Sequence, residues 1–78
     1  MAWTVDRELD ITSETCPMTF VRTRLALDRL DPGQILRVRL RGEEPRASVP
    51  RTAAAQGHAI LSAETDAAGI TVLLIRRG

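Results

Sequence analysis

The stretch PMTFVRTRLALDRLDPGQILRVRLR (residues 17–41) changes its hydrophobic period at a single turn. Before the turn, side chains suited to a core recur at i, i+3, i+7 and i+10, the spacing of one helix face. These are Phe20, Thr23, Leu27 and Leu30, with Thr19 and Ala26 beside them. After the Pro-Gly pair at residues 32–33, apolar and arginine residues alternate strictly, as in a strand that is buried on one face. The stretch therefore predicts a helix, a tight turn and a strand.

The flanking segments extend this pattern into an alternating order of strands and helices. The further predicted elements are a strand at residues 8–11, a helix that begins at Pro45, keeps Pro50 in its first turns and ends at Gly57, and strands at residues 58–64 and 70–77. The order β-α-β-α-β-β predicts an α/β fold. We expect a two-layer sandwich in which two helices pack on one face of a four-stranded mixed sheet.

Three arginines share the outer face of the predicted central strand: Arg37, Arg39 and Arg41. The simplest interpretation is a solvated strand face, and the alternative is a docking patch or a patch that faces RNA. No aromatic residues are interleaved with these arginines, and the formal net charge is only +1. Single-stranded nucleic acids are commonly bound by stacking on aromatic side chains, so direct RNA binding is not expected.

The length and composition are those of one small globular domain. The chain has 78 residues, of which 44% are hydrophobic and 27% charged, and we expect residues 1–78 to form a single domain. No apolar run approaches the roughly 20 residues of a membrane span, and the acidic first segment does not resemble a signal peptide. The single cysteine cannot form an internal disulfide. We therefore expect a cytoplasmic monomer that does not contact a membrane.

Cys16 lies where a polar loop meets the predicted helix, at or beside the helix N-cap. Unpaired N–H groups and the macrodipole favour a thiolate there, and Arg22 and Arg24 would add positive charge within two turns. We expect the pKa of Cys16 to be lowered into the range of about 3.5–7.5 found for such thiols.

The sequence offers Cys16 no evident catalytic partner. The only histidine, His58, lies at the far end of the second predicted helix, and the metal-binding residue types are too few for a closed site. A redox pair of the C-x-x-C type is excluded because residue 19 is threonine. No cofactor is expected. Two interpretations remain open, a thiol that carries a chemical group and a small, half-buried residue at a helix start.

Short motifs in a fixed order extend along nearly the whole chain. They are Leu9-Asp10, Cys16-Pro17, Pro32-Gly33, Glu43-Glu44-Pro45, Val49-Pro50, Gly57-His58 and LIRRG at residues 74–78. This series resembles the TusA/SirA-type sulfur-carrier family. The resemblance implies that Cys16 takes a sulfane sulfur, as a persulfide, from a cysteine desulfurase or a rhodanese-like donor. It would then relay that sulfur to an acceptor protein in tRNA thiolation, molybdenum-cofactor maturation or another sulfur-trafficking pathway, as a carrier rather than a self-sufficient enzyme.

One motif departs from the family. The family usually has Cys-Pro-x-Pro, whereas this chain has CPMT, with Thr19 in place of the second proline. Pro17 suits the first helical position, and Thr19 restores an N–H group that could point toward the sulfur. We therefore assign Pro17, Thr19, Arg22 and Arg24 supporting roles around Cys16.

A second apolar strip is predicted on the solvent side of the first helix. Met18, Val21 and Leu25 repeat at i, i+3 and i+7, about 140–200° round from the core stripe. We expect these side chains to dock a sulfur donor or acceptor, unless a neighbouring segment covers them. The rival interpretation is an interaction or regulatory module that transfers no sulfur, in which Cys16 is redox-sensitive or merely packed.

Overall fold

The structure is a computed structural model that describes residues 4–15 and 18–78. The elements are β1 (Arg7–Asp10), α1 (Met18–Asp28), β2 (Ile35–Arg41), α2 (Glu43–Ala55), β3 (Ala59–Thr65) and β4 (Ile70–Arg76). Their order matches the predicted β-α-β-α-β-β sequence. The predicted order of elements is therefore confirmed, and the period change at residues 32–33 separates α1 from β2 as expected.

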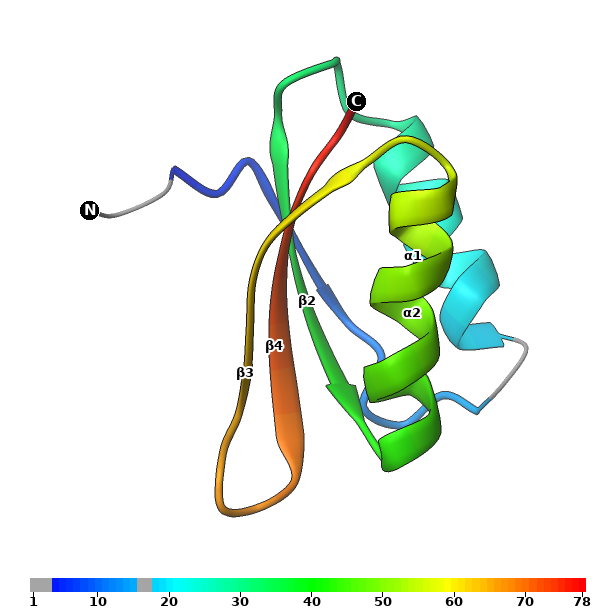
Figure 1. Ribbon diagram of the computed structural model, residues 1–78, viewed down its shortest axis with the longest axis vertical. Helices are drawn as coiled ribbons and strands as arrows, with labels where there is room; N and C mark the ends of the chain where they lie inside the picture. Colours follow the sequence, from blue (N-terminus) through cyan, green and yellow to red (C-terminus); the bar gives the residue numbers. More distant parts are fainter. Residues whose placement is uncertain (1–3, 16–17) are drawn as a thin grey trace.

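The strands form one mixed sheet in the order β1-β2-β4-β3. β1 pairs in parallel with β2, while β4 pairs antiparallel with both β2 and β3. Both helices lie on the same side of the sheet, which gives the predicted two-layer sandwich (Figure 1). Within residues 4–15 and 18–78, no helix lies on the opposite face of the sheet.

The core lies between the sheet and the two helices. Leu36, Val38 and Leu40 of β2 are fully buried, as the strict alternation predicts. The register pairs Leu36 with Ile75 and Val38 with Leu73, so that β2 and β4 present their apolar side chains to the same layer. Helix residues complete this cluster, among them Leu27, Val49 and Ala53.

The first helix differs slightly from the predicted core stripe. Thr23, Leu27 and Leu30 are buried, but Phe20 is only partly buried, while Thr19 is completely buried. The helix also ends at Asp28, so Leu30 packs from the following turn. At the start of the helix, the buried face therefore lies at Thr19 and not at Phe20, the next residue along the chain.

The second helix begins earlier than predicted. It starts at Glu43 rather than Pro45, and Pro50 is its eighth residue rather than part of its first turns. Gly42 turns the chain with a φ of 103°, and the acids that follow suit the positive end of the helix dipole. The prediction that Pro50 lies in the first turns of this helix was wrong. Proline cannot donate a hydrogen bond to the carbonyl four residues earlier, yet the helix continues past it.

The helix-free face of the sheet carries paired charges. Arg37 lies 3.1 Å from Glu8, and Arg39 lies 3.5 Å from Asp10. Both pairs join β2 to β1 and are solvent-exposed, which supports the simpler interpretation of the arginines as a solvated face.

Candidate functional site around the start of α1

Cys16 and Pro17 lie outside the described residues, so the site is defined by the chain on either side of them. Ile11 is buried, and its N–H group donates to the carbonyl of Arg39 at 2.9 Å. The N–H group of Glu14 then donates to the carbonyl of Ile11 at 3.1 Å, and that of Met18 to the carbonyl of Thr15 at 2.8 Å. These bonds hold the loop to the end of the sheet and join it to the first turn of α1.

The charges around this segment are more balanced than the sequence suggested. The carboxylate of Glu14 lies 3.0 Å from the guanidinium of Arg22. The two residues are eight positions apart along the chain, and the pair places a negative charge in the loop that leads to Cys16. Arg22 therefore lies near this segment, as expected, but its charge is partly neutralised.

Thr19 occupies a packing position. Its side chain is completely buried, and its carbonyl accepts a hydrogen bond from the hydroxyl of Thr23 at 2.7 Å. The hydroxyl of Thr23 is thus satisfied inside the core, as buried polar groups usually are. The supporting role of Thr19 toward Cys16 stays a prediction.

The predicted second apolar strip is exposed. Met18 and Val21 each retain 42% of their accessible surface, and Leu25 retains 54%. Among the residues that the structure describes, these are the large apolar side chains that are exposed. Their docking role stays a prediction, but the α1 face that carries them is open along its length. We refer to Met18, Val21 and Leu25 as the apolar strip.

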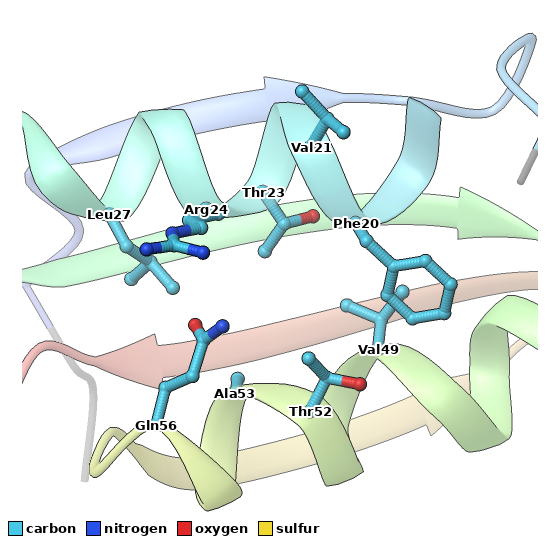
Figure 2. Close-up of a pocket in the computed structure, with 9 residues that line it drawn as sticks. All are labelled: Phe20, Val21, Thr23, Arg24, Leu27, Val49, Thr52, Ala53 and Gln56. Atoms are coloured by element: carbon cyan, nitrogen blue, oxygen red, sulfur yellow. The ribbon is translucent and has the colours of Figure 1, made fainter. Parts of the chain in front are cut away.

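A groove between the two helices adjoins the apolar strip. Figure 2 shows side chains of α1 facing side chains of α2 across it. The lining residues are Phe20, Val21, Thr23, Arg24, Leu27, Val49, Thr52, Ala53 and Gln56, and the groove has a volume of about 170 Å³. Arg24 lines the groove beside the apolar residues Leu27 and Val49. It makes no ion pair with any acid in residues 4–15 or 18–78. Val21 belongs to both the strip and the groove, so the two form one continuous surface.

Sequence reasoning missed the α2 side of this groove. Thr52 of α2 and Gln56, the cap residue after its end, are spaced at i and i+4, which is a signal for a shared helix face. Which helix that face meets depends on packing that a single sequence does not reveal.

The remaining polar side chains offer little for metal binding. Within residues 4–15 and 18–78, no three His, Asp or Glu side chains gather in a group that could hold a metal ion. His58 accepts a hydrogen bond on Nδ1 from the N–H group of Gly78 at 3.1 Å, and so contacts the C-terminal residue. In the same described segments, no helix has the length and apolar character to cross a membrane.

The family follows from a match along almost the whole chain. The family model described as "Sulfurtransferase TusA" matches residues 7–77, from β1 through the last residue but one. The chain belongs to the TusA family. The match includes the Cys16-Pro17 pair and all six described elements.

Relatives from three organisms agree with this assignment, and the name of each begins with "Putative sulfur carrier protein". A protein of Archaeoglobus fulgidus is 45% identical over 72% of this chain, which spans 64% of that relative's length. A Thermotoga maritima protein is 35% identical over 77% of this chain and 76% of its own. A Bacillus subtilis protein is 33% identical over 94% of this chain and 96% of its own.

A solved structure shares the fold. The crystal structure of a SirA-like protein from Desulfitobacterium hafniense superposes with a TM-score of 0.81. The superposition covers 92% of this chain and 97% of the other, at 20% identity. This similarity supports the two-layer sandwich of the TusA family.

Proposed function

We propose that this protein carries sulfur as a persulfide on Cys16. The observation that supports the proposal most is the TusA family match, which runs through the only cysteine of the chain. The proposed donor is a cysteine desulfurase or a rhodanese-type protein. The proposed acceptor is a further sulfur-handling protein, in tRNA thiolation, molybdenum-cofactor maturation or another sulfur-trafficking pathway.

The proposed reaction is an exchange between a thiolate and a persulfide. The thiolate of Cys16 attacks the terminal sulfur of the donor's persulfide, a new S–S bond forms, and the bond between the donor's two sulfurs breaks. The donor cysteine leaves as a thiolate, so no external oxidant or reductant is needed. An acceptor thiolate then attacks the outer sulfur on Cys16, and Cys16 leaves as a thiolate in turn.

This chemistry demands access and docking rather than a built-in acid or base. The apolar strip begins at Met18, two residues after Cys16, and remains exposed along α1. The loop on the other side is held to the sheet through the Ile11 N–H group, which donates to the carbonyl of Arg39. We infer that a partner binds the apolar strip and brings its own sulfur to Cys16.

The decisive experiment is intact mass spectrometry. The protein is incubated with a cysteine desulfurase holoenzyme and cysteine, or with a rhodanese and thiosulfate, and then analysed without reductant. We expect the protein to gain the mass of one sulfur atom, and Cys16→Ser to gain none while keeping its fold, because serine also caps helices well. A wild-type protein that binds these donors but never gains sulfur would favour the interaction-module alternative.

A further inference from the structure

A second groove lies on the opposite side of α1 from α2, between α1 and the edge strand β1. It has a volume of about 260 Å³. Arg7, Glu8 and Leu9 line it from β1, Arg22 and Leu25 line it from α1, and Arg29 lines it from the turn directly after α1. The groove shares Leu25 with the apolar strip, but the sulfur transfer proposed above does not use its β1 wall.

The groove is positively charged at one end. α1 runs from the end of β1 back to the start of β2, and β1 and β2 are parallel. Arg7, at the start of β1, and Arg29, just after the end of α1, therefore lie at the same end of the groove. Neither arginine makes an ion pair with an acid among the described residues. The one acid in the groove, Glu8, is paired with Arg37 on the helix-free face. Two guanidinium groups, one from each wall, are thus available for an anionic group.

The wall formed by β1 can also accept a further strand. In the described sheet, β1 is an edge strand and has a neighbour only in β2. An edge strand presents backbone N–H and C=O groups that can pair with an added extended segment. Such a segment would lie beside β1 and place alternate side chains against α1.

The spacing along α1 suits such a segment. Leu25 lies four residues before Arg29, the first residue after α1, and the helical rise of about 1.5 Å per residue puts them about 6 Å apart along the helix direction. Two residues of a strand cover about 6.6 Å at about 3.3 Å per residue and point to the same side. An acid at one strand position would therefore reach Arg7 and Arg29, while an apolar side chain two positions away contacts Leu25 and Leu9.

We propose that this groove binds an extended segment of a partner protein by β-strand addition to β1. The segment carries an acidic residue and an apolar residue separated by one position. The inference goes beyond the proposed function and does not depend on sulfur transfer. A polypeptide fits better than RNA, because the described residues of the groove supply apolar side chains, Leu9 and Leu25, and an unpaired strand edge, but no aromatic side chain for base stacking.

The test is an NMR titration with two peptides of equal composition. The first is acetyl-Thr-Glu-Thr-Val-Thr-Thr-amide, in which the acid and the valine share one side of a strand. The second is acetyl-Thr-Glu-Val-Thr-Thr-Thr-amide, in which they point to opposite sides. We expect the first to perturb the amide resonances of β1 and slow their hydrogen exchange, and to bind roughly tenfold more tightly than the second. Equal binding of the two peptides, or no binding of the first, would overturn the proposal.

Variants distinguish the groove from general charge effects. Arg7→Gln and Arg29→Gln should each weaken binding of the first peptide by roughly tenfold, whereas Arg51→Gln, an exposed position on α2, should leave it within about twofold. Cys16→Ser should bind like the wild type, so the result stands apart from the sulfur-transfer assay. An oligouridylate that binds the same arginines more tightly than the peptide would also overturn the assignment.

Discussion

The Glu14 carboxylate lies 3.0 Å from the Arg22 guanidinium, and this ion pair joins the loop before Cys16 to the second turn of α1. An acid in this place lowers the positive potential at the helix start, and the pair leaves Arg22 only partly available to support a thiolate. We therefore predict that the reactivity of Cys16 depends on the balance of these two charges.

This balance can be tested by removing one charge at a time. Glu14→Gln should raise the rate of Cys16 alkylation by iodoacetamide at neutral pH by roughly twofold to fivefold, and Arg22→Gln should lower it by a similar factor. Stability should change by less than about 1 kcal/mol, because the pair is solvent-accessible. Glu64→Gln, on β3, serves as the control and should leave the rate unchanged. Equal rates in all four proteins would show that the pair does not influence the thiol.

Two leucines of α1 offer a matched test of its faces. Leu27 is 1% exposed and belongs to the core, whereas Leu25 is 54% exposed. Leu27→Ala should lower the free energy of unfolding by about 2–5 kcal/mol, through lost burial and a cavity. Leu25→Ala should change it by less than about 0.5 kcal/mol. Urea denaturation followed by circular dichroism measures both, and similar losses would mean that the orientation of α1 is wrong.

Much of this arrangement could be predicted from periodicity alone. The change of period at residues 32–33 separated α1 from β2, and the spacing of Met18, Val21 and Leu25 predicted an exposed strip. Periodicity in one sequence predicts these features because each face of α1 and β2 lies in one environment, either core or solvent, along its whole length.

Features that depend on packing between elements could not be predicted in this way. The grooves on either side of α1 exist because of how α2 and β1 lie against it, which no local spacing reports. The Glu14–Arg22 pair requires the loop to fold back on the helix. The early start of α2 depends on Gly42, whose positive φ allows the chain to turn directly into the helix after β2.

Acidification should weaken the contact between β1 and its following loop. The N–H group of Thr12 donates to Asp10 Oδ1 at 2.9 Å, and the Thr12 hydroxyl donates to the same oxygen at 2.7 Å. These bonds, with a smaller contribution from the nearby Arg39 charge, hold the pKa of Asp10 below its ordinary value of 3.8. Because the folded-state pKa is lowered, the stabilisation is present above the unfolded value and is lost as the pH falls below about 4 through the folded value.

The Asp10→Asn variant tests this linkage. It keeps an oxygen acceptor for Thr12 but cannot titrate, so its unfolding free energy should fall less steeply than that of the wild type between about pH 4 and pH 2. Thermal unfolding across this range, with an NMR titration of the Asp10 carboxyl group, gives both measurements. A carboxyl midpoint at or above 3.8 would contradict the hydrogen-bond assignment.

The docking role of the apolar strip leads to the sharpest functional prediction. Val21 and Leu25 are exposed, and Val21 also lines the groove that α1 forms with α2. Replacing both with aspartate should leave the core intact and leave Cys16 free to react with small reagents. A partner that buries these side chains would instead meet two charges, so sulfur transfer from a desulfurase should slow by about tenfold or more.

The matched control places the same two charges on the other helix. Ala47 and Ala54 are exposed on α2, so the Ala47→Asp, Ala54→Asp double variant adds equal charge away from the strip. Its transfer rate should stay within about twofold of the wild type, which separates local docking from the effect of net charge. If the Val21 and Leu25 variant unfolds, the strip belongs to the core. If it folds, alkylates normally and still accepts sulfur at the wild-type rate, the donor docks on another surface.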